Sequence, residues 1–195
     1  MKILMVHGFW DTGYVFRRLE RALTTAGHQC FSPTLRPRDG RHGLADLAGK
    51  LAGYIDAQLD DESPFAIVGF SMGCLVARYY LQRLREGRRA RAFFAISGPM
   101  RGTATAFLYP GRGARDMRPG SRFVRELEGG SAGLDGLLLR TYYTPLDLMI
   151  LPATSSRMAG VAELRVWSPL HPLMLVNRRV AADIIRNLEQ LNFSG

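Results

Sequence analysis

The chain has 195 residues, of which 47% are apolar and 22% are charged, and its formal net charge is +9. This composition excludes a disordered chain, and the length predicts a single domain over residues 1–195 that needs no disulfide or metal for stability. No apolar run approaches the roughly 18 residues of a membrane span, so a transmembrane helix is not expected.

The start of the chain differs from a secretion signal. Its apolar run, residues 3–6, ends at His7, whereas the apolar core of a signal peptide has about 7–15 residues. The two cysteines, Cys30 and Cys74, have neither the spacing of a disulfide framework nor that of a zinc site. We therefore expect a cytoplasmic protein with no cofactor and no metal.

The positive charge comes almost entirely from arginine, since Lys2 and Lys50 are the only lysines among 26 basic residues. A basic chain can bind nucleic acid, anionic lipid or an acidic partner. The densest cluster lies between residues 83 and 91, at the end of a predicted helix, where the helix dipole favours cations. No nucleic-acid motif accompanies this cluster, so nucleic-acid binding is not expected, while association with an anionic lipid surface stays open.

Strands and helices alternate along the first half of the predicted fold. The predicted strands are apolar on both faces, and the predicted helices repeat apolar residues every three to four positions. In chain order the predicted elements are strand 2–6, helix 14–26, strand 28–35, helix 44–59, strand 64–70, helix 72–85 and strand 91–97.

Residues 98–137 interrupt this alternation, because they are rich in glycine and arginine and contain one predicted helix, residues 121–128. They are expected to form either a short cap-like insertion after the fourth strand, able to act as a lid, or an ordinary connecting segment. Strands that are apolar on both faces and separated by amphipathic helices predict an α/β fold, with a mostly parallel sheet of about six strands flanked by helices. The remaining predicted elements are strand 137–143, strand 162–166 and helix 175–191.

A G-x-S-x-G pattern at residues 69–73 places Ser71 between a predicted buried strand and a predicted helix. This context is typical of a nucleophile elbow, a sharp turn that projects the serine above the sheet. Glycine at positions 69 and 73 would let the strand and helix backbones approach closely, with Ser71 at the positive end of the helix dipole. The alternative is a serine that only caps the helix.

A carbonyl group attacked by Ser71 would develop an oxyanion, which preorganised N–H groups must stabilise. The predicted donors are the backbone amides of Met72, directly after the nucleophile, and of Phe9, in the loop after the first strand. His7 precedes this loop and is expected to shape it by hydrogen bonding, not to act as the catalytic base.

A nucleophilic serine needs a base, and the base needs an orienting acid. His171 is the predicted base because it follows the last strand, and ligands bind at the carboxyl edge of a parallel sheet. Asp147 is the predicted acid because it follows a strand among apolar neighbours, where a carboxylate needs a partner. Asp135 is the second choice, and the remaining acids considered are Asp116, Glu126, Glu128 and Glu163.

The order Ser71, Asp147, His171 is that of α/β hydrolases. The chain resembles the α/β-hydrolase superfamily, nearest to bacterial lipase- and esterase-like members, in a minimal form with few residues before the oxyanion loop. Phe70 and Cys74 stand where lipase-like relatives often have histidine and glycine. The resemblance implies a serine hydrolase that cleaves a carboxylic ester through an acyl-enzyme. The segments that carry it are residues 6–11, 69–81, 98–103, 143–147 and 170–173.

Apolar side chains near the predicted site are candidates for an acyl pocket, which makes a small acyl ester or a lipid the expected partner. Trp10 and Phe70 flank the site, whereas the others belong to the insertion. A thioesterase, an amidase or a lipid deacylase would share the triad, and a binding protein of the same fold would lack the chemistry. The pocket candidates from the insertion are Phe107, Leu108, Tyr109 and Met117.

Overall fold

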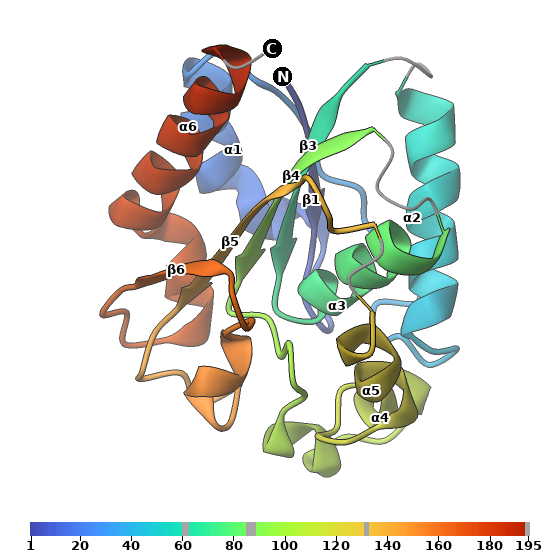
Figure 1. The fold of residues 1–195 in the computed structure, drawn as a ribbon. Coiled ribbons are helices and arrows are strands. Elements are labelled where there is room, and N and C mark those ends of the chain that lie inside the picture. Colours follow the sequence, from blue (N-terminus) through green and yellow to red (C-terminus); the bar gives the residue numbers. More distant parts are fainter. Residues whose placement is uncertain (60–62, 85–88, 131–132, 194–195) are drawn as a thin grey trace.

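The computed structural model describes residues 1–59, 63–84, 89–130 and 133–193. Six strands form one sheet in the order β2-β1-β3-β4-β5-β6, and every neighbouring pair is parallel (Figure 1). The predicted α/β fold with six strands is thereby confirmed. The strands are β1 (Lys2–Val6), β2 (Gln29–Phe31), β3 (Phe65–Phe70), β4 (Ala90–Ile96), β5 (Leu138–Tyr143) and β6 (Ala162–Arg165).

Helices cover both faces of the sheet (Figure 1). Successive residues of β1 point to opposite faces, so Leu4 and Val6 pack toward α2 and α3 while Ile3 and Met5 pack toward α1 and α6. This two-sided burial explains why the central strands are apolar at every position. The main helices are α1 (Arg17–Thr25), α2 (Leu44–Gln58), α3 (Met72–Tyr79) and α6 (Arg178–Phe193).

The strand predicted over residues 28–35 is wrong beyond Phe31. Pro33 has no N–H for a strand ladder, and the N–H of Leu35 instead donates a hydrogen bond to the side chain of His7. The chain therefore leaves the sheet edge early and runs beside the loop that follows β1.

Three predicted helices also differ from the prediction near one end. The helix predicted over residues 72–85 becomes a π-helix over Tyr80–Leu84, and Arg85 lies outside the described residues, as does Arg88 of the arginine cluster. The helix predicted from residue 175 begins at Arg178, because His171–Val176 form a 3-10 helix. The first helix likewise starts as a 3-10 turn, Gly13–Phe16.

The described residues of the segment 98–137, namely 98–130 and 133–137, pack beside α2 and α3, beyond the carboxyl ends of the strands (Figure 1). The Asp116 carboxylate accepts a hydrogen bond of 2.8 Å from the N–H of Leu44, the first residue of α2. The predicted helix over residues 121–128 is present, with Ser121 as its N-cap. The role of the segment as a lid stays a prediction. Its helices are η3 (Ala104–Leu108), α4 (Arg112–Asp116) and α5 (Arg122–Glu128).

Within the described residues, no helix combines the length and the apolar character that crossing a bilayer requires.

Candidate active site

Ser71 occupies a sharp turn between β3 and α3, with a φ of 52°. A side chain rarely adopts this left-handed region unless the surrounding structure enforces it. The enforcement comes from close backbone contacts: a Cβ added to Gly73 would lie 2.0 Å from the carbonyl oxygen of Val6, and one added to Gly69 would lie 2.7 Å from the Cα of Cys74. The two glycines therefore let α3 start directly against the ends of β1 and β3, which is the geometry of a nucleophile elbow.

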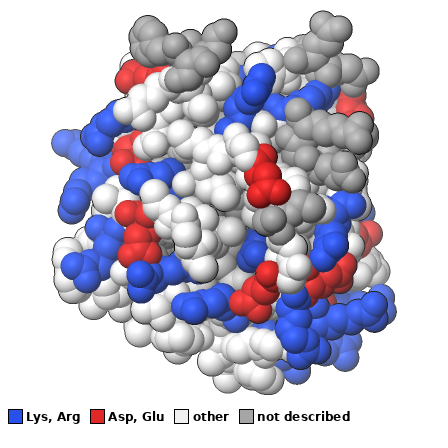
Figure 2. Space-filling view, in the orientation of Figure 1, with Lys and Arg blue, Asp and Glu red and all other residues white. Residues whose placement is uncertain are grey.

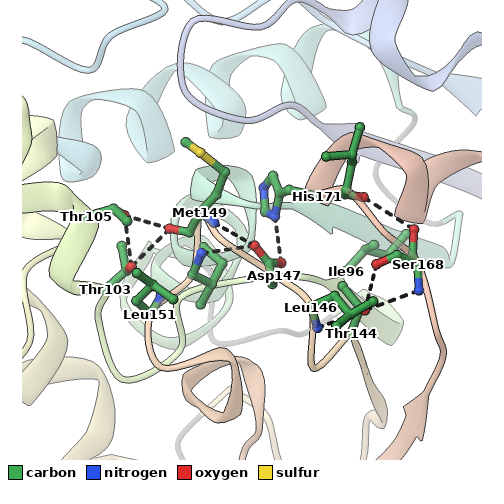
Figure 3. A network of polar contacts seen from close by, with 12 residues as sticks. Ile96, Thr103, Thr105, Thr144, Leu146, Asp147, Met149, Leu151, Ser168 and His171 are labelled. Atoms are coloured by element: carbon green, nitrogen blue, oxygen red, sulfur yellow. Dashed lines mark hydrogen bonds and ion pairs between the residues drawn. The ribbon is translucent and has the colours of Figure 1, made fainter.

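His171 and Asp147 lie on neighbouring loops, after β6 and β5 respectively, and their side chains meet (Figure 3). Nδ1 of His171 is 2.7 Å from Oδ2 of Asp147, and both residues are buried. The other carboxylate oxygen accepts hydrogen bonds from the backbone N–H groups of Met149, at 2.9 Å, and Ile150, at 3.0 Å. The carboxylate is thus held on one side by the backbone and holds the imidazole on the other, so that the ring proton stays on Nδ1.

The environment of the second ring nitrogen of His171, Nε2, differs from that of Nδ1. Nε2 is buried and has no hydrogen-bond partner among the described residues, Ser71 included. Ser71 and His171 nevertheless line the same cavity, whose volume is about 480 Å³. Catalytic hydrogen bonds are often long without substrate and tighten when it binds. The site can therefore supply a hydroxyl and a basic nitrogen to a molecule in this cavity.

The cavity around Ser71 is mainly apolar. Phe70 also orders the site, since its ring packs against the ring of His171 with the centroids 4.8 Å apart. Three of the six predicted pocket residues, Trp10, Phe70 and Tyr109, do line the cavity. The sequence analysis missed a second group of lining residues, which flank Asp147 and His171 in the chain: Leu146, Leu148, Met149, Pro169, Leu170 and Pro172.

The structure does not bring the other predicted pocket residues to this cavity. Phe107 and Leu108 are 60% and 78% exposed, and the Phe107 ring packs beneath the guanidinium of Arg118, 4.7 Å from its centroid. Met117 is buried in the core on the α2 side of the sheet. The short 3-10 turn of η3 directs Phe107 and Leu108 away from Ser71, and the apolar loop around Asp147 takes their place.

His7 holds the loop that follows β1. Its Nε2 accepts a hydrogen bond of 2.9 Å from the N–H of Leu35, so its proton is on Nδ1, which donates to the carbonyl of Gly8 at 2.8 Å. Burial is the main cause that lowers the pKa of His7, which favours this neutral form. Phe9 follows directly and lines the cavity, while Met72 is the first residue of α3. The roles of these two amides as oxyanion donors stay predictions.

We expect His7→Ala to lower the free energy of unfolding by about 1–3 kcal/mol, because it leaves the buried N–H of Leu35 without an acceptor. It should also lower kcat for an ester substrate by about 10²-fold, since the loop that presents Phe9 loses its anchor. His7→Gln, whose side-chain oxygen can reach the same N–H, is the matched variant and should recover most of both losses. Urea denaturation and initial-rate kinetics measure the two effects.

The burial of His7 also predicts how the free energy of unfolding depends on pH. Because the pKa of His7 is lowered from 6.5 in the folded state, the unfolded chain binds more protons below that pH. The stability that neutral His7 provides is therefore fully present above pH 6.5 and is lost as the pH falls through the lowered pKa. His7→Gln cannot titrate, so its stability should fall less than that of the wild type between pH 7.5 and pH 5. Parallel losses would contradict this role.

Two threonines with no distinctive sequence signal hold the loops of the acid and the base (Figure 3). Oγ1 of Thr144 donates to the carbonyl of Ser168 at 2.8 Å and accepts from the N–H of the same residue at 3.2 Å. Oγ1 of Thr103 accepts from the N–H of Leu151 at 2.8 Å and donates to the carbonyl of Met149 at 3.0 Å. Thr144 thus ties the end of β5 to the segment before His171, and Thr103 ties the loop of Asp147 to the segment after β4.

Asp11 is a further carboxylate in the cavity, also missed from sequence. Burial is the main cause that raises its pKa, and the nearby charges of His7, His171 and Arg38 oppose that rise. Asp135, the alternative acid, lines a different cavity together with Arg78. The structure therefore brings Asp147, and not Asp135, to His171. In the described part of the chain, no three His, Cys, Asp or Glu side chains are grouped as metal ligands would be.

Comparison with known proteins identifies solved structures that have a similar fold. Among solved structures, Aspergillus fumigatus lipase B is similar with a TM-score of 0.81 and 18% identity over 94% of this chain, which spans only 51% of the lipase chain. The pyrethroid hydrolase PytH is similar with a TM-score of 0.67 and 16% identity over 97% of both chains. Polyneuridine aldehyde esterase is similar with a TM-score of 0.67 and 15% identity, over 96% of this chain and 98% of its own.

A search of curated proteins found no match. The family model described as the alpha/beta hydrolase family matches residues 3–188, which is nearly the whole chain and includes every residue of the site described above. The turn at Ser71, the Asp147–His171 pair and the parallel sheet that positions them agree with this match, and the chain belongs to the alpha/beta hydrolase family.

Proposed function

We propose that the protein is a serine hydrolase that cleaves carboxylic esters through an acyl-enzyme. The observation that carries this proposal is the hydrogen bond between His171 Nδ1 and Asp147, together with an unpartnered Nε2 in the cavity that Ser71 lines. This arrangement orients a neutral imidazole as a base for a serine hydroxyl.

In the proposed reaction, Oγ of Ser71 attacks the ester carbonyl carbon while Nε2 of His171 takes the hydroxyl proton. The backbone amides of Phe9 and Met72 stabilise the oxyanion of the tetrahedral intermediate. His171 then gives its proton to the leaving alcohol, which departs and leaves Ser71 acylated. Water, activated by the same nitrogen, releases the acid and restores the serine. Asp147 keeps the proton of Nδ1 in place and stabilises the imidazolium.

The apolar walls of the cavity favour an uncharged acyl group as the part of the substrate bound beside Ser71. A small acyl ester or a lipid is therefore the proposed substrate class, in keeping with the lipase and esterase folds to which the chain is similar. A cytoplasmic location stays a prediction from sequence.

The test is covalent labelling with a fluorophosphonate, followed by the mass of the intact protein. We expect one adduct on the wild type and none on Ser71→Ala. A series of p-nitrophenyl esters, with matched thioesters and anilides, should then show ester cleavage as the fastest reaction. Folded wild type that takes up no adduct and cleaves no ester would overturn the proposal and favour a non-catalytic binding protein. A thioester or anilide cleaved faster than its matched ester would move the protein to a thioesterase or an amidase.

A further inference from the structure

A second hollow, the basic groove, adjoins the catalytic cavity. It is lined by Trp10, by residues 36–39, 41 and 42 of the following loop and by Lys50 of α2, and its volume is about 540 Å³. Trp10 lines both the groove and the cavity that contains Ser71. The groove and the catalytic cavity therefore adjoin at the Trp10 side chain.

The groove carries an excess of positive charge. Its walls contain Arg36, Arg38, Arg41 and Lys50 but a single carboxylate, Asp39. Lys50 is paired with Asp46, 2.7 Å away, which does not line the groove. Asp39 forms an ion pair with Arg41, whose guanidinium lies 3.0 Å from the carboxylate, and this contact lowers the pKa of the Asp39 carboxyl. In the described part of the chain, Arg36 and Arg38 have no carboxylate within ion-pair distance.

Net charge alone does not single out this groove. Figure 2 shows Lys and Arg side chains spread over much of one face, with fewer Asp and Glu side chains between them. What distinguishes the groove is that unpaired guanidinium groups stand at a concave surface joined to the site of chemistry.

Hydrogen bonds also connect the groove to the loop that contains Phe9. The N–H of Trp10 donates to the carbonyl of Arg38 at 3.0 Å, and the Arg38 guanidinium donates to the carbonyl of Trp10 at 3.2 Å. The Trp10 ring packs against those of Phe9 and Tyr109, with centroids 4.8 and 5.4 Å away. The wall between the two hollows is therefore an ordered aromatic cluster, and the groove has a fixed place relative to Ser71.

We infer that the basic groove binds a phosphate group carried by the alcohol part of the ester substrate. The apolar cavity takes the acyl chain, so the opposite end of the molecule is the part that reaches the groove. Guanidinium groups match phosphate oxygens in geometry and charge, which favours phosphate over an uncharged alcohol. This inference rests on the proposed ester hydrolysis and defines its substrate class as acyl esters of phosphorylated alcohols.

The test compares two substrates that differ only in the phosphate: 1-butyrylglycerol and 1-butyrylglycerol 3-phosphate. We expect the wild type to show a kcat/KM about tenfold higher for the phosphate ester at low ionic strength, and a smaller preference in 0.5 M salt, as expected for about 1.4 kcal/mol of exposed charge interaction. Butyrate release measured by chromatography follows both reactions. A third substrate, 1-dodecanoylglycerol 3-phosphate in micelles, separates the sources, since a higher kcat/KM there indicates a lipid and a lower one a soluble phosphate ester.

Arg36→Glu should abolish the preference, reducing the ratio of the two kcat/KM values about tenfold. Arg21→Glu, an exposed change of equal charge on α1 across the sheet, is the matched control and should leave the ratio unchanged. Thermal unfolding verifies that both variants fold, and Arg36→Gln should give an intermediate ratio.

Hydrolysis of both soluble esters with equal kcat/KM would overturn the phosphate site while leaving ester hydrolysis intact. Equal loss of preference in Arg36→Glu and Arg21→Glu would also overturn it, because the effect would then come from net charge. Failure to cleave either ester or p-nitrophenyl butyrate would instead remove the proposed function and, with it, this inference.

Discussion

Ser71→Ala is expected to lower kcat for ester hydrolysis by about 10⁴–10⁶-fold, because the nucleophile and its base act as a unit. The change removes a single oxygen from a residue that lines the cavity, so KM and the free energy of unfolding should change little. Alanine tolerates the φ of 52° about as well as serine does, and the close packing of Gly69 and Gly73 that enforces the turn is untouched. Steady-state kinetics with p-nitrophenyl butyrate, beside urea denaturation, measures both expectations.

Ser156→Ala is the matched control for this loss. Ser156 is also buried, and its hydroxyl has no partner among the described residues, yet it lies in the 3-10 helix η4 (Ala153–Ser156), outside the cavity lining. Its removal should leave kcat within about twofold of the wild type. Near-normal turnover by Ser71→Ala would remove Ser71 from the mechanism, whatever the control shows.

The layout of the sheet was predictable because it depends on local patterns. Four-residue or longer apolar runs such as β3 are buried on both faces, and only a parallel sheet between helices offers that environment. The elbow was predictable for the same reason, since Gly69, Ser71 and Gly73 are close in sequence and their steric demands act within one turn. In a parallel sheet the carboxyl ends of β5 and β6 lie at the same edge, so the segments that follow these strands bring Asp147 and His171 to that edge.

The lining of the cavity was harder to predict, because it depends on which loop folds over which strand end. Phe107 and Leu108 have the right chemistry for an acyl pocket, but η3 directs them outward. Leu148 and Met149 line the cavity instead, since their loop is fixed by the hydrogen bond that Thr103 donates to the Met149 carbonyl and by the one that the Asp147 carboxylate accepts from the Met149 N–H. The contact between Thr103 and Met149 joins residues 46 positions apart, and no periodicity in one sequence reports it.

The early end of β2 depends on a distant side chain as well as on the local sequence. Ser32, Pro33 and Thr34 interrupt the apolar pattern before Leu35, and the N–H of Leu35 bonds to the imidazole of His7. That bond holds the chain beside the loop that follows β1, so the edge strand ends early and the loop beside the candidate site gains an anchor.

Asp147→Asn is expected to lower kcat by about 10⁴-fold, although the substitution changes neither the size nor the shape of the side chain. One carboxylate oxygen accepts from the N–H groups of Met149 and Ile150, and the other faces Nδ1 of His171. Asparagine has one oxygen and one NH₂ group. Its oxygen must stay with the two backbone donors, so its NH₂ group faces Nδ1 and forces the ring proton onto Nε2. A histidine in that tautomer cannot take the proton of Ser71.

The opposite orientation of the amide does not rescue the variant, because it would set the NH₂ group against two backbone donors in a buried loop. Asp147→Asn should therefore fold, as near-wild-type circular dichroism would verify, and should lose fluorophosphonate labelling together with turnover. Asp135→Asn is the matched control, since Asp135 lies at a separate cavity and its change should leave kcat nearly unaltered. If Asp135→Asn were the damaging change and Asp147→Asn remained active, the 2.7 Å contact with His171 would be structural and the orienting acid would have to lie elsewhere.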